Sequence, residues 1–107
     1  MNQENLKRGT AELIVLHLLQ EKDMYGYQLA QEVWKNSREH YLLPEGSLYP
    51  IMYRLVKKGC VTDYNEIVKK RMRKYYHIEE AGKQYYRELR AEYETIMKGV
   101  AYILDAK

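Results

Sequence analysis

The chain has 107 residues, of which 46% are hydrophobic and 31% are charged. This composition is typical of one folded domain and excludes a disordered or membrane-embedded chain, and the length excludes a TIM barrel. No apolar run approaches the ~20 residues of a spanning helix, and the N-terminal residues lack the apolar core of a signal peptide, so we expect a cytoplasmic protein. Cys60 is the single cysteine, which excludes an internal disulfide and any multi-cysteine metal site.

Positive charge is concentrated in one stretch of the chain. The net charge is +3 overall, but residues 54–76 hold eight basic and two acidic side chains, a local net charge of +6. A basic patch of this kind attracts polyanions such as nucleic acid whatever the total charge. The chain also has twelve tyrosines and no phenylalanine, and tyrosine suits partly buried interfaces because it joins an apolar ring to a polar hydroxyl.

The first part of the sequence predicts two helices that build a core. Residues 11–19 are apolar around nearly the whole helical circumference, so we expect this helix in the middle of the core, with Thr10 as its N-cap. A second helix is predicted at about residues 27–34, and residues 36–40 and 41–43 indicate a connector and a short extended piece. The buried face of the second helix is expected to comprise Leu29, Ala30, Val33 and Trp34.

A third helix is predicted to begin just after Ser47. Gly46 permits the turn, Ser47 is a suitable N-cap, and Pro50 would then occupy the third helical position, where a missing N–H breaks no intrahelical bond. Lys58-Gly59 is a typical C-terminal stop. The apolar face of this helix comprises Leu48, Ile51, Met52 and Leu55. The opposite face comprises Pro50, Tyr53, Arg54 and Lys57, with Ser47 at the exposed N-terminal end.

Two short strands and a long helix complete the chain. Residues 60–64 and 74–78 alternate apolar and polar side chains, which predicts a β-hairpin whose tip is the basic segment 65–73. Residues 80–106 then indicate one helix, which at 1.5 Å per residue is roughly 40 Å long. An apolar stripe along this helix comprises Tyr85, Leu89, Tyr93, Ile96, Val100 and Ile103.

This order of elements predicts a mainly α fold with a small β-hairpin, a winged helix-turn-helix followed by a long C-terminal helix. We expect residues 1–79 to form a DNA-binding domain and residues 80–107 to form a dimerisation helix, because the small globule cannot cover the whole stripe; a helix folded back on its own core is the alternative. A homodimer would present two recognition helices about 34 Å apart to a near-palindromic site in double-stranded DNA. The residues expected to dimerise are Leu89, Tyr93, Ile96, Val100 and Ile103.

The third helix and the hairpin carry the residue types that DNA recognition needs. A recognition helix has one apolar face that holds it in place and an opposite face that bonds bases and phosphates. The second face is supplied by Ser47, Tyr53, Arg54 and Lys57, although an ordinary amphipathic helix with solvated charges has the same pattern. Phosphate contacts, which position the protein without specifying sequence, are expected from Lys57, Lys69, Lys70, Arg71, Arg73 and Lys74.

The sequence does not favour an enzyme. His17 lies in the apolar first helix, where a hydrogen-bonded structural role is expected, and neither it nor His40 or His77 has a carboxylate and a nucleophile at the spacing of a triad. Cys60 is expected to be a small buried residue rather than a reactive thiol. There is no phosphate-binding loop, dinucleotide fingerprint or zinc ligand set, so we expect no enzymatic activity, no cofactor and no metal.

Several motifs resemble those of the PadR family of bacterial transcriptional regulators. They are Leu6-Lys-Arg-Gly-Thr10, Tyr25-Gly-Tyr-Gln-Leu29, Gly46-Ser-Leu-Tyr-Pro50, Arg54-Leu55 before Gly59, and Arg73-Lys-Tyr-Tyr76. The chain is similar to the short form of the family, with one C-terminal dimerisation helix. The wing tip departs from the family pattern because it lacks glycine and proline, and Glu79 stands where a capping threonine is usual.

The resemblance implies a homodimeric winged-helix repressor that releases DNA when it binds a small aromatic or hydrophobic ligand. It assigns recognition-helix positions to Ser47, Tyr49 and Tyr53. It also implies an effector site near the dimer interface, for which the candidates are Trp34, Tyr93, Ile96, Met97 and Val100. These five residues would equally serve as core or dimer packing.

Two other functions stay open at this point. A winged helix can bind protein through the same faces, and the many tyrosines would suit such an interaction module. The chain could also be a DNA-binding protein that responds to no ligand. A steep salt dependence of DNA binding would count against the first alternative, and a compound that weakens DNA binding would count against the second.

Overall fold

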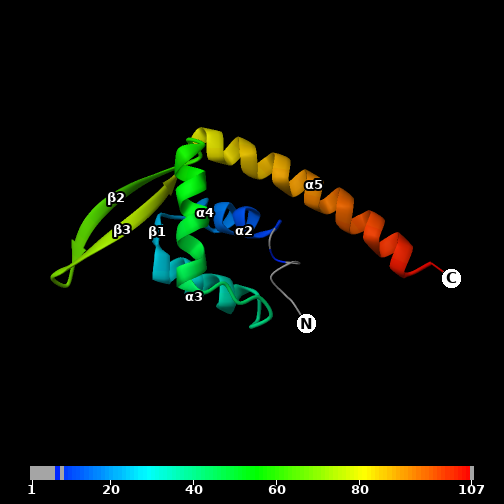
Figure 1. Cartoon of the computed structure of the whole chain (residues 1–107), viewed down its shortest axis with the longest axis horizontal. Coiled ribbons are helices and arrows are strands. Elements are labelled where there is room, and N and C mark those ends of the chain that lie inside the picture. The colour runs from blue at the N-terminus through cyan, green and yellow to red at the C-terminus, as the bar shows by residue number, and fades with distance from the viewer. Residues whose placement is uncertain (1–6, 8, 107) are drawn as a thin grey trace.

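The computed structural model describes residue 7 and residues 9–106, so Leu6 and Arg8 of the first motif lie outside the described residues. The described elements are, in chain order, helix α2 (Ala11–Leu19), strand β1 (Met24–Tyr25), helix α3 (Gly26–Asn36), helix α4 (Glu45–Lys57), strands β2 (Val61–Val68) and β3 (Arg71–Ile78), and helix α5 (Glu80–Leu104). The β2–β3 hairpin and α5 extend in opposite directions from the packed helices α2, α3 and α4 (Figure 1). The predicted fold, a winged helix-turn-helix with a long terminal helix, is confirmed.

The first two helices lie where the sequence predicts them, with differences at their ends. Thr10 stands at the N-cap of α2 but makes no side-chain capping bond. Its hydroxyl instead donates to the Lys7 carbonyl at 2.9 Å and lies 2.8 Å from the Tyr41 hydroxyl. Helix α3 runs from Gly26 to Asn36 and is longer than predicted at both ends. Trp34, expected on its buried face, is 38% exposed.

Helix α4 begins earlier than predicted, at Glu45, with Pro44 as its N-cap. Ser47 is therefore already helical, and its N–H donates to the Pro44 carbonyl at 3.0 Å. Pro50 lies inside the helix rather than in its first turn, so the carbonyl of Gly46 loses its intrahelical donor. Gly46 is exposed, and water can bond this carbonyl instead.

The sheet is larger than the predicted hairpin. Three antiparallel strands lie in the order β1-β3-β2, and β1 has only two residues, too few to show an alternating pattern in the sequence. Strands β2 and β3 pair as far as Val68 and Arg71, so most of the segment predicted as the tip is strand. The turn consists of Lys69 and Lys70 alone, with φ values of 52° and 66°.

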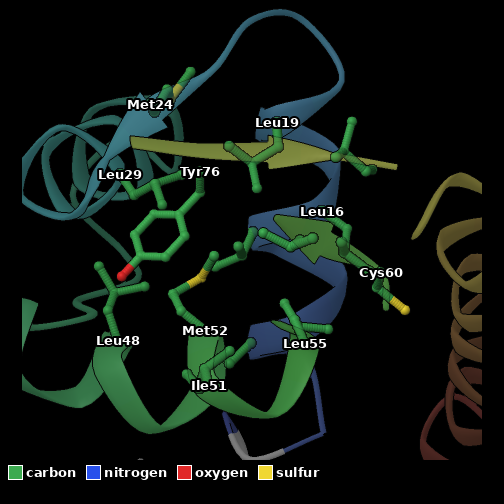
Figure 2. Close-up of a cluster of buried hydrophobic side chains, with 14 of the residues drawn as sticks. Leu16, Leu19, Met24, Leu29, Leu48, Ile51, Met52, Leu55, Cys60 and Tyr76 are labelled. Atoms are coloured by element: carbon green, nitrogen blue, oxygen red, sulfur yellow. The ribbon is translucent and has the colours of Figure 1, made fainter. Parts of the chain in front are cut away.

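The core lies where α2, α3 and α4 meet the inner face of the sheet (Figure 2). Leu16, Leu48 and Leu55 are fully buried, and Tyr76 of β3 is 4% exposed among them. Cys60 is also buried, as predicted. The buried face predicted for the third helix is confirmed, because Leu48, Ile51, Met52 and Leu55 are its buried residues.

Among the described residues, helix α5 is buried against the domain in its first turns. Its buried residues are Gly82 and Tyr86, and a Cβ at Gly82 would collide with the carbonyl oxygen of Cys60. Tyr85 and Leu89 pack partly against the core. Beyond them the large apolar side chains are exposed, from Val100 at 40% to Ile103 at 76%.

Candidate nucleic-acid interface

The outer face of α4 presents polar and aromatic side chains on a rigid scaffold. Tyr49 is 50% exposed and Tyr53 is 63% exposed, and Ser47 and Lys57 are exposed as well. The Lys57 ammonium lies 5.4 Å from the centre of the Tyr53 ring, a distance at which the cation is attracted to the ring face. The structure therefore brings together four of the residues predicted for the recognition helix.

Tyr49 is held by a neighbour that the sequence reasoning did not single out. Its hydroxyl donates to Oε2 of Glu45 at 2.6 Å, and this bond is the main reason that the pKa of Tyr49 is raised to about 12. A Cβ at Gly26 would lie 3.4 Å from the same hydroxyl, so the start of α3 packs closely against α4 here. The spacing of four residues between Glu45 and Tyr49 on one helix was the available signal.

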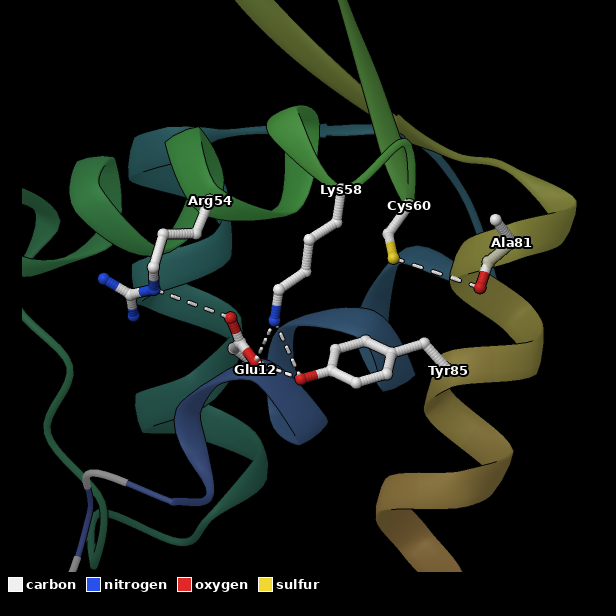
Figure 3. A network of polar contacts seen from close by, with 6 residues as sticks. All are labelled: Glu12, Arg54, Lys58, Cys60, Ala81 and Tyr85. Carbon is white, nitrogen blue, oxygen red and sulfur yellow. Dashed lines mark hydrogen bonds and ion pairs between the residues drawn. The ribbon is translucent and has the colours of Figure 1, made fainter.

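Arg54, on another side of α4, and Lys58, directly after the helix, face α2 and α5 (Figure 3). Their Nε and Nζ atoms each lie 3.7 Å from a carboxylate oxygen of Glu12, whose side chain is only 17% exposed. The Tyr85 hydroxyl donates to Glu12 at 2.7 Å, and Lys58 donates to the Tyr85 hydroxyl at 3.1 Å. The bond to Tyr85 is the main reason that the pKa of Lys58 is raised.

This network joins α2, α4 and α5. Arg54, which the sequence predicts to contact DNA, therefore has Glu12 as a structural partner. The Arg54 side chain stays 56% exposed. Glu12 lies 42 residues before Arg54 and 73 before Tyr85 in the chain, so no local spacing could reveal the contact.

The β2–β3 hairpin, called the wing from here on, carries its cations at its tip and along β3. Lys69, Lys70, Arg71 and Lys74 are exposed. Lys74 lies 4.0 Å from the Asp63 carboxylate across the hairpin. Both turn residues adopt the left-handed conformation, which costs about 1–2 kcal/mol for a residue with a Cβ. Two lysines are thus held at positions where Asn and Gly are favoured.

A row of tyrosines stiffens the base of the wing. Tyr25, Tyr75 and Tyr64 lie opposite one another on the three strands, with ring centres 5.4 Å and 5.7 Å apart. The guanidinium of Arg73 lies 4.4 Å from the Tyr25 ring centre. Arg73, predicted to contact phosphate, therefore also packs on the outer face of the sheet.

Asp23 fastens the wing to the loop after α2. It accepts a hydrogen bond from the Tyr64 hydroxyl at 2.7 Å and lies 2.8 Å from Nδ1 of His77. Partial burial raises the pKa of Asp23, but the hydrogen bonds from Tyr64 and His77 outweigh it and hold that pKa below its ordinary value. His77 therefore has an acidic partner that sequence spacing did not indicate.

A groove of about 520 Å³ separates the wing from the start of α4. Arg71, Met72 and Lys74 line one side, and Glu45 and Tyr49 line the other. The sequence-predicted contacts of the helix and of the wing thus border one depression in the surface.

A second cavity, of about 500 Å³, lies between α2, α3 and α5. Of the candidate effector residues Tyr93 lines it, whereas Trp34, Ile96, Met97 and Val100 do not. Tyr86 also lines it, and its hydroxyl accepts a hydrogen bond from Arg90 at 2.8 Å and lies 2.6 Å from Nδ1 of His17. His17 is exposed but hydrogen-bonded.

Residues 15–88 match the transcriptional regulator PadR-like family. The chain belongs to this family. It is 30% identical over 94 residues to a transcriptional regulator of Mycobacterium tuberculosis, covering 88% of this chain and 85% of that protein. The structure resembles that of a transcriptional regulator from Clostridium thermocellum, with a TM-score of 0.86, 31% identity, and coverage of 96% of this chain and 99% of the other.

A PadR family transcriptional regulator from Eggerthella lenta has a similar structure, with a TM-score of 0.84, 29% identity, and coverage of 96% of this chain and 88% of the other. The resemblance to the PadR family is therefore confirmed, and the chain is a PadR-like transcriptional regulator and not an enzyme. Across the described residues, no helix is both long and apolar enough to cross a lipid bilayer.

Proposed function

We propose that this PadR-like regulator is a homodimeric, sequence-specific repressor that a small hydrophobic or aromatic effector releases from DNA. The observation that carries the proposal is the outer face of α4. Four of its side chains are free of the core and lie beside a basic wing, while its inner face is buried against α2 and α3. This arrangement suits a helix that enters the major groove.

In this proposal α4 supplies selectivity through Ser47, Tyr49 and Tyr53, and cations supply most of the affinity. Lysine and arginine contacts to phosphate release counterions, so binding depends steeply on salt. The phosphate contacts proposed are those of Lys57, Lys69, Lys70, Arg71, Arg73 and Lys74. Arg54 adds to them only through the part of its guanidinium that Glu12 leaves exposed.

The free half of α5 supports a dimer. Tyr93 and Val100 are 42% and 40% exposed, and Ile96 and Ile103 are more exposed still. Contiguous exposed apolar surface of this kind marks an interaction site. Leu89, also proposed for dimerisation, packs partly on its own core. Val100→Glu is expected to give monomers in sedimentation velocity with an unchanged helical spectrum.

The cavity between α2, α3 and α5 supports an effector site. Leu13, Ile14 and Leu18 give it an apolar wall, and Tyr86 and Tyr93 supply aromatic surface. It lies at the root of the free half of α5, beside the proposed dimer contact. A ligand shifts the equilibrium between dimer geometries only by its different affinity for each, so an effector would favour the geometry that no longer fits the operator.

The first test is selection of DNA by the purified protein. Sheared DNA from the source organism is incubated with the protein at moderate salt with excess nonspecific competitor, and the retained fragments are sequenced. One or a few enriched near-palindromes would support the proposal, and a small aromatic compound that releases them would support the effector. No enrichment at any salt concentration, with the protein shown to be folded, would favour the protein-interaction module.

A further inference from the structure

Helix α5 is bonded to α2 by two tyrosines that follow each other in the chain. The Tyr85 hydroxyl donates to Glu12 at 2.7 Å, and the Tyr86 hydroxyl lies 2.6 Å from Nδ1 of His17. Glu12 and His17 are five residues apart in α2, which is about 7.5 Å along the helix axis. Two neighbouring side chains of α5 are thus bonded to two separate points of α2.

The two bonds lie on different sides of the contact between α2 and α5. Tyr86 and His17 line the cavity between α2, α3 and α5, whereas Tyr85 and Glu12 do not. Oε2 of Glu12 instead lies 3.7 Å from Nε of Arg54 in α4, so Tyr85 belongs to the network that joins α2 to α4 (Figure 3). One tyrosine therefore borders the proposed effector site, and the other bonds a partner of α4.

The hydroxyl of Tyr86 already uses its single proton. Arg90 donates to this hydroxyl at 2.8 Å, so the phenolic proton is directed to His17, whose Nδ1 accepts it. The Tyr86 side chain is buried, with 7% exposure. A ligand in the cavity that carries its own hydrogen-bond donor competes with the Tyr86 hydroxyl for Nδ1, and a ligand without a donor does not.

The backbone of α5 links the two contacts. Both tyrosines lie about one turn after Gly82, where the helix approaches the Cys60 carbonyl too closely to admit a Cβ, and this contact is the natural pivot of the helix. A movement of α5 that takes Tyr86 away from α2 also takes Tyr85 away from Glu12, because the helical backbone holds neighbouring residues in fixed positions. The Glu12 carboxylate, 17% exposed, must then approach the cations of the network to replace the lost donor.

We propose that Tyr85 and Tyr86 form a latch between α5 and α2, and that a ligand with a hydrogen-bond donor opens it from the cavity by replacing the Tyr86 hydroxyl on His17. Tyr85 then leaves Glu12, and the change reaches α4. Tyr85 is in this scheme a positioning residue that never touches the ligand. The inference rests on the effector cavity proposed above. Because opening the latch and binding the ligand are coupled, a weakened latch gives tighter binding.

Two probes of similar shape separate latch opening from simple filling of the cavity. Fluoroindole has an N–H donor, whereas fluorobenzothiophene has none. Binding is titrated by fluorine NMR, and nuclear Overhauser effects to the methyl groups of Ile14 and Leu18 locate each probe in the cavity. Tyr85→Phe is expected to bind fluoroindole about tenfold more tightly than wild type, because the bond to Glu12 no longer has to break. Its affinity for fluorobenzothiophene is expected to be unchanged.

The wild-type protein gives a second readout that needs no substitution. With tyrosine labelled at Cζ, fluoroindole is expected to shift the resonance of Tyr85, although Tyr85 does not line the cavity, and fluorobenzothiophene is expected to leave it in place. Tyr102→Phe is the control variant, because Tyr102 is 72% exposed near the end of α5, and it should keep the wild-type affinity for both probes. Circular dichroism establishes that each variant is folded.

Several results would overturn the inference. Equal or weaker binding of fluoroindole by Tyr85→Phe, or a Tyr85 resonance that fluoroindole does not move, would refute the latch and leave the effector cavity intact. A similar gain in affinity for both probes would also refute it, because the substitution would then only loosen the cavity wall. Wild-type protein that binds neither probe in the cavity would overturn both the latch and the effector cavity, whereas DNA binding is decided separately by the selection experiment.

Discussion

Replacing Tyr85 by phenylalanine would test whether the network around Glu12 stabilises the seating of α4 and α5. The change removes only a hydroxyl, so the ring keeps its partial packing against the core. It deletes the 2.7 Å bond to Glu12 and the 3.1 Å bond from Lys58. The two cations remain 3.7 Å from the carboxylate, beyond hydrogen-bonding distance, so a carboxylate that is only 17% exposed loses its short donor.

The expected cost follows from this geometry. A hydrogen bond to a charged group contributes about 1.5–3 kcal/mol, and partial exposure of Glu12 reduces that toward the lower end, so we expect Tyr85→Phe to lower the free energy of unfolding by about 1–2 kcal/mol. For a domain of this size, each kcal/mol corresponds to roughly 4–8 °C in Tm. The assay is urea and thermal unfolding at one fixed protein concentration, since the proposed dimerisation would make stability depend on concentration.

Tyr102→Phe is the matched control, because Tyr102 is 72% exposed near the end of α5. It is expected to change stability by less than about 0.5 kcal/mol. Equal stabilities for wild type and Tyr85→Phe would refute the reasoning and would show that the ion pairs alone hold Glu12. An equally large loss in Tyr102→Phe would show that the effect is not specific to the network.

Three further predictions concern the interface and the wing. Tyr53→Ala combined with Lys57→Ala is expected to weaken operator binding at least about tenfold by gel shift without changing stability, because both side chains are exposed; unchanged affinity in the folded protein would contradict the recognition-helix assignment. Lys69→Asn combined with Lys70→Gly is expected to raise the free energy of unfolding by about 1 kcal/mol or more, because these residues suit the left-handed turn, and to weaken DNA binding; a less stable variant would show that the turn is not strained. The pKa of Asp23 in the folded protein is below its unfolded value, near 3.8. Asp23 therefore contributes stability at pH values above 3.8, and this stability is lost as the pH falls through the folded-state pKa. In Asp23→Asn the free energy of unfolding should lack this loss at acidic pH. A pH profile of stability identical to that of the wild type would contradict the role assigned to Asp23.

The sequence predicted those features that depend on local spacing. The apolar positions Leu48, Ile51, Met52 and Leu55 recur at helical intervals, and all four are buried. Ends of elements were less accurate, because they depend on contacts from elsewhere. Ser47 satisfies the sequence rule for an N-cap, but the backbone bond from Ser47 to Pro44 starts the helix earlier.

The features that sequence reasoning missed are non-local. The pairing of β2 with β3 continues to the lysine turn although the segment lacks alternating hydrophobicity. Strand β1 forms because Tyr25 pairs with Tyr75, which lies fifty residues later in the chain. Glu12 acquires its partners only after three helices have packed together. Trp34 fits the predicted buried face by spacing, yet nothing covers it within the described part of the chain enough to bury it.

The close approach of Gly82 to the Cys60 carbonyl fixes one end of α5, so the helix can act as a lever. The Glu79 N–H also bonds that carbonyl, at 2.9 Å, and the Thr62 hydroxyl bonds the Glu79 carboxylate at 2.7 Å, so the root of the wing and the first turn of α5 are clamped at one point. The 25 residues of α5 then form an arm of roughly 37 Å. A tilt of about 5° at the clamp would move the far end by about 3 Å over that length. In a dimer joined through the arms, a small change beside the clamp would therefore become a large change in the separation of the two α4 helices.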